Sequence, residues 1–533
     1  MGAKNSAAQA IGADIVDIRK RVEARVKEEE EKYGTGGGSC GDDEIDSEFI
    51  RNCLNAGELG DAELFKRLQR DKFVYNKSMD GWMVWTGHHW EVDKLDRALA
   101  VVEDVVLEYQ KEIMRINEEI HALDSQAADS EANRLKSIRK ALNKKILGLR
   151  CSNKRRSCVT FAHTTDDSLS IVGNEVDKKP WLLACKNGVV DLRSGELRDG
   201  RPEDYLLKAC PVEWQGVDAP CPLFEKALLE ILSDNESLYN FFQRLVGFSL
   251  VGDVLQSIIA VLTGQGRNGK SLLVNVFSMI LGQLAGPVRS EMLLDQARNN
   301  SSSGPTPDIM ALRGRRLCFA SETDDGCKIS PSRVKWLTGN DQLTGRNPHD
   351  KYEVEFKPTH TLFLLTNHKP HAPADDFAFW ERVILIPFDL SFVNRKPVAD
   401  NEREADPELL SKLKEELPGI FAWMVKGCLY WQNTGGLKPP AIVKEATADY
   451  RRDEDALGDF FEECTQPNPE AITGATALYT CFEQWWEKNI SKKIPKQRWF
   501  GKQAQKRYHR EKKSGTYKYF GVELIADQGQ PGT

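Results

Sequence analysis

An eight-residue glycine-rich segment at 264–271 constrains the fold of this chain more than any other feature. Its sequence, GQGRNGKS, fits the pattern G-x-x-x-x-G-K-[ST] and lies between an apolar run at 258–262 and a helical pattern that ends at Gly282. Strand, glycine loop and helix in this order predict a phosphate-binding loop in an α/β fold. The pattern alone does not separate kinases, GTPases and motor ATPases. The residues expected to bind a nucleoside triphosphate are Gly264, Gly266, Asn268, Gly269, Lys270 and Ser271.

Each residue type in this segment has its own task. The glycines let the backbone fold so that several N–H groups face the phosphates. Lys270 reaches the β and γ oxygens, and the Ser271 hydroxyl ligates Mg²⁺. The ordinary alternative is a Gly/Ser loop that carries a lysine by chance.

Three further polar residues follow or precede apolar strands in the order that a motor ATPase requires. Glu322 follows the run 317–320 and is the candidate acid that holds magnesium and polarises water, with Asp324 as its alternate. Asn367 follows the run 362–365 and is the candidate γ-phosphate sensor. Arg382 precedes the run 383–386 and is the candidate arginine finger for a neighbouring subunit. Each has an ordinary alternative, namely a loop-capping acid, a turn asparagine or a surface-paired arginine; the expected metal ligands are Ser271, Glu322 and Asp324.

Composition limits the other functions of the chain. Acidic residues outnumber basic ones by 80 to 73, so contact with nucleic acid must come from local basic patches. The 12 cysteines include no C-x-x-C pair, which predicts reduced thiols and no structural metal. No apolar run approaches the roughly 18 residues of a membrane span. We therefore expect a soluble protein without membrane contact, in the cytoplasm of a bacterial cell or a phage-infected host.

Changes in pattern divide the chain into four regions. Residues 1–42 predict a helix and a Gly-rich linker, and residues 43–205 an α+β region with a helical hairpin at 95–150, interrupted near 125–130. Residues 206–445 alternate strands and helices as the ATPase core, and residues 446–533 form a smaller C-terminal domain. Tryptophans at 82, 85 and 90 predict a β-hairpin, where packing on a small sheet is the ordinary role and stacking on bases the alternative.

The C-terminal domain carries the strongest basic patch. Eleven Lys or Arg and one acid, Glu511, lie between Lys492 and Lys518. Helices around 441–464 and 474–489, then a basic helix, then strands at 516–520 and 522–525 predict a winged-helix-like fold that binds DNA. A solvated face or a protein-docking surface is the alternative. The candidate DNA contacts here are Lys506, Arg507 and Arg510.

These motifs resemble the superfamily 3 helicases, in particular the C-terminal helicase part of phage and plasmid primase-helicases, which is also similar to the poxvirus primase-helicase. The matching segments are GQGRNGKS at 264–271, SETDDG at 321–326, WLTGNDQLTGR at 336–346, FKPTHTLFLLTNHKP at 356–370 and FWERVILIPF at 379–388, with WLLACKNGVVDLRSGEL at 181–197 and CLNAGELGDAELFKRL at 53–68 upstream. The resemblance implies an AAA+ type P-loop ATPase that uses ATP and Mg²⁺. It also implies a ring, usually a homo-hexamer, that moves 3′ to 5′ on single-stranded DNA and unwinds forked duplex.

The resemblance further implies a DNA-tracking hairpin between the acid-bearing strand and the sensor strand. It places Arg346, His349 and Lys351 on or near a turn at 347–348. Cationic loops in a ring pore grip phosphates without regard to base identity. Here the hairpin is about one residue longer than the usual pattern, so its tip is assigned only to within one position.

Other features depart from the family pattern. Relatives often carry Arg-Arg after the tryptophan, whereas this chain has Glu381-Arg382, so Arg382 is the finger candidate at that place. Many relatives also carry an N-terminal primase domain, for which the first 205 residues leave no room. We expect no primer synthesis by this chain, and a separate primase chain is a candidate partner.

Three functions are compatible with these sequence features. The first is an ATP-dependent replicative DNA helicase of phage, plasmid or prophage type. The second is a DNA-stimulated ATPase that remodels or translocates on duplex DNA without separating its strands. The third is an initiator scaffold whose nucleotide site is purely structural, against which the presence of Lys270, Glu322, Asn367 and Arg382 argues.

Overall fold

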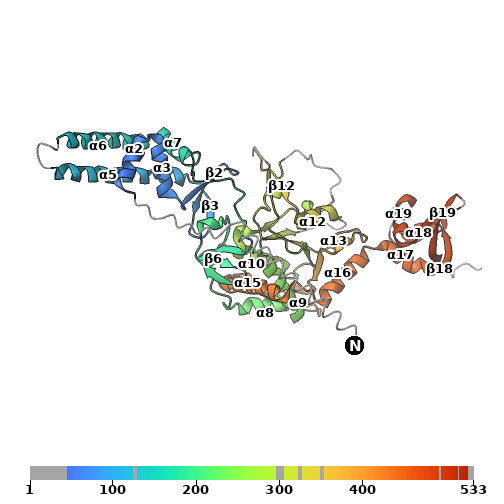
Figure 1. Ribbon diagram of the computed structural model, residues 1–533. Helices are drawn as coiled ribbons and strands as arrows, with labels where there is room; N and C mark the ends of the chain where they lie inside the picture. Colours follow the sequence, from blue (N-terminus) through green and yellow to red (C-terminus); the bar gives the residue numbers. More distant parts are fainter. Residues whose placement is uncertain are drawn as a thin grey trace, which may run out of the picture.

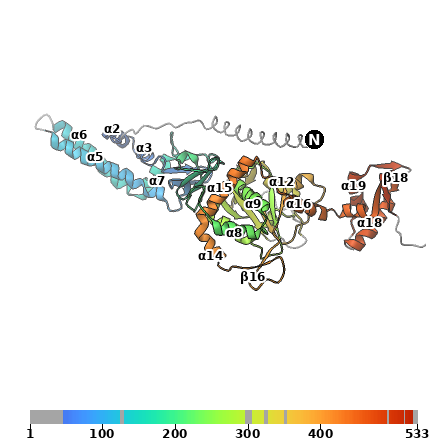
Figure 2. The same cartoon turned by 90° about the horizontal axis from the view of Figure 1, so that it is seen from below.

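The computed structural model describes residues 45–123, 129–295, 305–321, 327–348, 353–490, 494–513 and 515–525. The described chain is elongated, with a helical hairpin at one end, a large α/β body in the middle and a small domain at the other end (Figure 1). A view turned by 90° shows the same three parts in a row (Figure 2). The helix and linker expected at 1–42 lie outside the described residues.

Helices form the N-terminal end. They are α2 (Ser47–Asn55), α3 (Glu58–Gln69), α4 (Arg97–Ala100), α5 (Val102–Ala122), α6 (Asp129–Leu149) and α7 (Ser152–Ala162). The apolar residues of α5 recur every three or four positions and bury one stripe against the other helices, Tyr109 and Ile116 among them. The Tyr109 hydroxyl and the Lys145 ammonium both donate to the Asp61 carboxylate, at 2.8 and 2.6 Å. The base of the α5–α6 hairpin is therefore fixed by polar as well as apolar contacts.

A four-stranded sheet in the order β3-β2-β1-β4 follows. Its strands are β1 (Phe73–Asn76), β2 (Gly81–Trp85), β3 (Trp90–Val92) and β4 (Ser170–Ile171). Trp85 pairs with Trp90 across the hairpin. The Trp90 indole is 2% exposed and donates to the Pro202 carbonyl at 2.8 Å. Trp90 therefore packs the sheet and does not stack on bases.

The second small sheet, β7-β6-β5-β8, belongs to the hydrophobic core of the ATPase region. Its strands are β5 (Leu182–Cys185), β6 (Gly188–Asp191), β7 (Glu196–Arg198) and β8 (Ala209–Cys210). Trp181, Leu183 and Val190 lie in one buried cluster with the helices on the central sheet, and the Trp181 ring stacks on Trp431 with centroids 6.2 Å apart. A division at residue 205, as the sequence suggests, would cut through this shared core.

Five parallel strands form the central sheet in the order β10-β11-β14-β9-β15. They are β10 (Ala285–Pro287), β11 (Leu317–Ser321), β14 (Thr361–Thr366), β9 (Ile259–Thr263) and β15 (Val383–Pro387). Parallel strands that are covered on both faces consist of continuous apolar residues, and β9 and β14 have such sequences. The fold is mixed α/β with a parallel sheet, in agreement with the predicted class.

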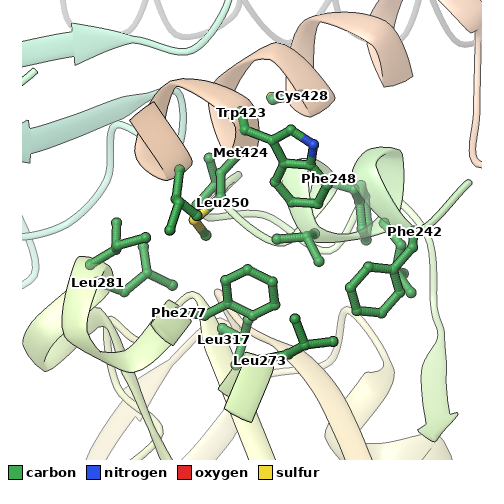
Figure 3. Packing of buried hydrophobic residues seen from close by; sticks show 14 of the residues in the cluster. Phe242, Phe248, Leu250, Leu273, Phe277, Leu281, Leu317, Trp423, Met424 and Cys428 are labelled. Atoms are coloured by element: carbon green, nitrogen blue, oxygen red, sulfur yellow. The ribbon is translucent and has the colours of Figure 1, made fainter. Parts of the chain in front are cut away.

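Helices cover both faces of this sheet. One face carries α8 (Pro222–Ile231), α9 (Glu236–Phe248), α10 (Lys270–Leu281) and α15 (Leu417–Thr434), and the other carries α12 (Pro331–Thr338), α13 (Phe377–Trp380) and α16 (Ala441–Asp453). Figure 3 shows the packing of the helices on the first face, where Phe277 of α10 and Trp423 of α15 face each other. Their rings are nearly parallel, 7° apart, with centroids at 6.4 Å. This packing fixes the helix that follows the glycine loop.

The remaining elements of the body are short. They are β12 (Leu343–Gly345), β13 (Val354–Phe356), β16 (Ser391–Val393), β17 (Glu402–Glu404), α11 (Pro307–Met310) and α14 (Leu409–Leu413). α16 packs on β15: the Thr447 hydroxyl accepts from the Leu385 amide at 3.0 Å, and Tyr450 is buried edge-on against Trp380. The body therefore extends to Asp453, beyond the limit of 445 that the sequence suggests.

The C-terminal domain contains α17 (Ala456–Cys464), β18 (Thr465–Gly474), α18 (Ala475–Asn489), α19 (Gln497–Arg507), β19 (Arg510–Lys513) and β20 (Thr516–Leu524). Its sheet has the order β18-β20-β19. Two strands were expected at 516–520 and 522–525, but β20 continues through both ranges and pairs with β19 instead. Gly515, with φ of 83°, occupies the tight turn between β19 and β20. Arg510 consequently lies on a strand and not on the basic helix.

Among the described residues no helix is long and apolar enough to cross a membrane. The same part of the chain contains no group of three or more His, Cys, Asp or Glu side chains arranged to hold a metal ion.

Candidate functional site

The glycine loop joins β9 to α10. Gly266 and Gly269 have φ of 90° and 83°, in the left-handed region that favours glycine. A Cβ at Gly269 would lie 2.8 Å from Ile231 Cδ1, whereas a Cβ at Gly266 would meet open space. The buried Asn268 amide donates to the Phe388 carbonyl at 3.4 Å. The loop is therefore packed on its protein side and open at Gly266, as a phosphate cradle requires.

Lys270, the first residue of α10, points back across the loop. Its ammonium donates to the Gly264 carbonyl at 2.8 Å and lies 3.5 Å from Oδ1 of Asn367. The residue is 5% exposed, and burial lowers the pKa of the ammonium to about 8. Because burial disfavours the charged form, an anion beside this group would restore its charge. A triphosphate fits that requirement.

The order of the strands brings Asn367 to this place. β14 lies between β9 and β11, with Thr366 opposite Thr263 and Leu365 opposite Ser321. The carboxyl ends of all three strands therefore meet at the edge where α10 begins, the usual ligand edge of an open α/β sheet. Asn367 follows β14 directly and is exposed there. Lys270 and Asn367, expected from the sequence to serve one site, lie together.

The expected magnesium site is described in part. Ser271 is exposed in the first turn of α10, where free backbone N–H groups and the helix dipole favour anions. A hydroxyl at this place suits the Mg²⁺ that accompanies a triphosphate. Glu322 and Asp324, the other expected ligands, follow β11 but lie outside the described residues. The assignment of those two carboxylates stays a prediction.

Arg382 lies at the opposite edge of the sheet from the glycine loop. It precedes β15, whose first residue, Val383, pairs with Ile259 at the start of β9. β9 is five residues long, which at about 3.3 Å per residue puts Arg382 roughly 16 Å from the loop of its own chain. Its guanidinium donates to the Ala378 carbonyl, and Nε is buried without a partner among the described residues. Arg382 therefore lies far from the glycine loop of its own chain, and its role as an arginine finger stays a prediction.

The expected DNA-tracking hairpin is an antiparallel pair, β12 with β13, in the register Leu343 to Phe356 and Gly345 to Val354. Arg346 follows β12, and its backbone bonds to Thr306 hold the start of the hairpin loop. His349 and Lys351 lie outside the described residues.

Two of the three C-terminal basic candidates pair with acids of the same chain. Lys506 pairs with Asp375 of the body, and Arg507 pairs with Asp455 and lies over the Phe461 ring at 5.5 Å. Both pairs are partly exposed, so they are weak and exchangeable. DNA phosphates would compete with these carboxylates for the same cations.

Arg510, the third basic candidate, contacts two residues of its own domain. Its guanidinium lies over the Tyr517 ring at 4.4 Å and donates to the Gly501 carbonyl at 3.4 Å.

Two acidic residues that the sequence did not single out lie between the sensor and the finger. Asp376 is the N-cap of α13, and its carboxylate accepts from the Phe379 amide at 3.0 Å and from the Lys335 ammonium at 2.9 Å. Asp375 precedes it and forms the ion pair with Lys506. An Asp three residues before Phe379 is a capping signal, but capping alone does not indicate a role beside Arg382.

Comparison with known proteins finds relatives named as helicases and primases. Residues 62–233 match the family described as D5 N terminal like. The chain is 25% identical to the putative helicase L207/L206 of Acanthamoeba polyphaga mimivirus over 465 residues, which cover 84% of this chain and 47% of that protein. The resemblance to D5-like primase-helicases is confirmed. The chain is also 26% identical to the putative helicase 022R of Frog virus 3, over 70% of this chain and 44% of the relative.

The putative primase C962R of African swine fever virus (strain Badajoz 1971 Vero-adapted) is 23% identical, over 60% of this chain and 34% of the viral protein. This chain spans about half the length of the curated relatives it matches. Among solved structures, the apo C-terminal region of NrS-1 matches 87% of this chain and 99% of its own, with a TM-score of 0.48 and 11% identity.

Proposed function

We propose that this chain is an ATP-driven replicative DNA helicase of the superfamily 3 type. One observation carries the proposal: the Lys270 ammonium and the Asn367 amide oxygen lie 3.5 Å apart at the carboxyl edge of β9 and β14. One side chain is suited to hold the β/γ-phosphates and the other to orient the attacking water. The viral relatives named as putative helicases and primases support the same conclusion.

The strand order supports an AAA+ type core. A strand inserted between the phosphate-loop strand β9 and the acid-bearing strand β11 puts a polar sensor between lysine and acid. With ATP and Mg²⁺ bound, the metal would neutralise charge on the triphosphate. Lys270 and the loop amides would position the phosphates, Ser271 and Glu322 would hold the metal, and Asn367 would orient water.

The place of Arg382 supports a ring. A finger roughly 16 Å from its own loop can complete only a neighbour's site, so hydrolysis requires an assembly in which each subunit faces the next. We propose a homo-hexamer that encircles single-stranded DNA and moves 3′ to 5′. The hairpin β12–β13, through Arg346, His349 and Lys351, would contact phosphates inside the ring.

The C-terminal element order, helix, strand, two helices and two strands, supports a winged-helix-like domain. Lys506, Arg507 and Arg510 would contact the backbone of duplex DNA at the fork. A separate primase chain is the further partner we propose, because the relatives include a protein named as a putative primase.

Unwinding of partial duplexes that carry a 3′ tail, a 5′ tail or no tail tests this proposal. Release of the labelled strand from the 3′-tailed substrate alone, dependent on ATP, is the expected result. DNA-stimulated hydrolysis without strand release from any substrate would identify the remodelling ATPase instead. Hydrolysis that DNA does not change, in a protein that sediments as a monomer, would contradict the ring model.

A further inference from the structure

The segment 371–382 connects the candidate sensor strand to the candidate finger, and several side chains hold it. Glu454 accepts from the Ala372 amide at 3.0 Å and lies 3.2 Å from Nδ1 of His371. Arg451 donates to the Ala374 carbonyl at 3.1 Å. Both come from the end of α16, where the chain passes into the C-terminal domain. The end of α16 therefore holds this segment close to the point where the C-terminal domain begins.

Asp376 lies in the middle of this segment, one helical turn before Arg382, which ends it. Its carboxylate caps α13, the single helical turn that leads to Arg382, and binds Lys335 of α12 at 2.9 Å. Burial by itself raises the pKa of this carboxyl, but Lys335, the Phe379 amide and the Arg382 charge lower it overall. α12 in turn leads into β12 and the DNA-tracking hairpin. Asp376 therefore joins α12, the helix that precedes the hairpin, to the helical turn that precedes Arg382.

Asp375, its neighbour, takes Lys506 from the basic helix α19. Lys506 cannot pair with Asp375 and neutralise a DNA phosphate with the same geometry. DNA bound by α19 would therefore take Lys506 away from Asp375, which is adjacent to Asp376, the N-cap of α13. The two adjacent carboxylates thus bind two different elements: Asp375 pairs with the basic helix α19, and Asp376 pairs through Lys335 with α12, which precedes the hairpin.

We propose that Asp376 is a positioning residue for the arginine finger and that the Lys506–Asp375 pair is a latch, which restrains the segment 371–382 until DNA takes Lys506. This inference rests on the proposed function and adds a route by which DNA regulates hydrolysis. In the latched state Arg382 stays folded back on α13. When DNA opens the latch, the segment gains the freedom to present Arg382 to the neighbouring subunit.

Mixed-subunit hydrolysis tests the positioning role. Asp376→Asn keeps a side chain that caps helices well but removes the charge facing Lys335 and Arg382. We expect kcat to fall on the order of ten- to a hundredfold, the loss typical of a catalytic group displaced by about 1 Å, with KM for ATP unchanged. Mixing Asp376→Asn with Lys270→Ala subunits should restore activity, because the Lys270→Ala subunit supplies an intact finger to the intact loop of its neighbour.

A comparison with Arg382→Ala separates the positioning role of Asp376 from the arginine finger itself. Arg382→Ala should lose turnover and regain it in the same mixture. If Arg382→Ala is rescued and Asp376→Asn is not, Asp376 acts within its own subunit and the positioning role is overturned. If Arg382→Ala itself keeps full turnover, the trans finger fails, and with it both the proposed ring mechanism and this inference.

Two variants with opposite effects on DNA affinity test the latch. Asp375→Asn frees Lys506, and Lys506→Gln removes it. Both should raise DNA-free hydrolysis, by about two- to fivefold as expected for loss of a partly exposed ion pair. Asp375→Asn should tighten binding to a forked DNA probe, and Lys506→Gln should weaken it.

The matched control for the latch is Asp406→Asn, which removes the acid of an exposed Lys–Asp pair with Lys412 elsewhere in the body. It should change neither hydrolysis nor DNA affinity. DNA-free hydrolysis that stays at the wild-type level in both latch variants would overturn the latch. A rise in Asp406→Asn equal to that in Asp375→Asn would overturn it too, because the effect would then be general.

Discussion

Replacement of Lys270 by methionine is expected to stabilise the nucleotide-free protein while it removes nucleotide binding. Burial lowers the pKa of this ammonium from 10.5 to about 8. At about 1.4 kcal/mol for each tenfold change in proton affinity, the charged form costs about 3 kcal/mol in the folded state at pH 7. Loss of the bond to the Gly264 carbonyl offsets about 1 kcal/mol of that gain. The variant should therefore gain about 2 kcal/mol.

The pH dependence of this gain follows from the direction of the pKa shift. Between pH 8 and 10.5 the folded wild-type protein holds fewer protons at Lys270 than the unfolded chain, so its stability rises with pH across that window. The advantage of Lys270→Met is full below pH 8 and declines above it. For a body of this size, about 2 kcal/mol corresponds to an expected rise in Tm at pH 7 of roughly 3–4 °C.

Thermal unfolding at pH 7 and at pH 9.5, with and without ATP and Mg²⁺, measures both effects. ATP should raise the Tm of the wild type and leave Lys270→Met unchanged. Asn275→Met, at an exposed position on the same helix, is the matched control and should shift Tm by less than about 1 °C. A lower Tm for Lys270→Met at pH 7, or an advantage that grows with pH, would show that the buried Lys270 charge does not destabilise the folded protein.

Three further predictions concern catalysis and DNA. The Kd for ATP should be constant below pH 8 and rise about tenfold per pH unit above it, because the Lys270 charge is then lost in the free enzyme; a flat profile to pH 9.5 would contradict this. Glu322→Gln should bind ATP normally and lose turnover, and unchanged turnover would show that another group is the catalytic acid. Lys351→Ala should reduce DNA-stimulated hydrolysis more than basal hydrolysis, whereas an equal loss of both would indicate a role in folding.

The strand–loop–helix geometry of the candidate site was predictable because its signals are local. The glycine loop and its flanking strand and helix lie within 25 residues of sequence, 258–282, and each constrains the next. The position of Asn367 beside Lys270 was predictable because buried parallel strands are apolar, and a polar residue that follows one lies at the ligand edge of the sheet. The same reasoning placed the core strands, since β9, β14 and β15 are continuous apolar runs.

Long-range contacts were not predictable in this way. Nothing near Trp181 or Val190 indicates that the sheet β5–β8 shares its core with α15, some 240 residues later. The pairing of Lys506 with Asp375 joins residues 131 positions apart. The strand β19 was missed because Arg510–Lys513 are all charged, and a basic run on an exposed edge strand has no apolar alternation to reveal it.

The most direct test of the account follows ATP hydrolysis and strand separation in the same reaction, with wild type and Lys270→Ala, on a forked DNA with a 3′ tail. We expect wild type to hydrolyse ATP faster with DNA and to release the strand, and Lys270→Ala to lose both activities together. Strand release that persists in Lys270→Ala, or hydrolysis by wild type that never separates the strands, would contradict the assignment of this site as the motor of a helicase.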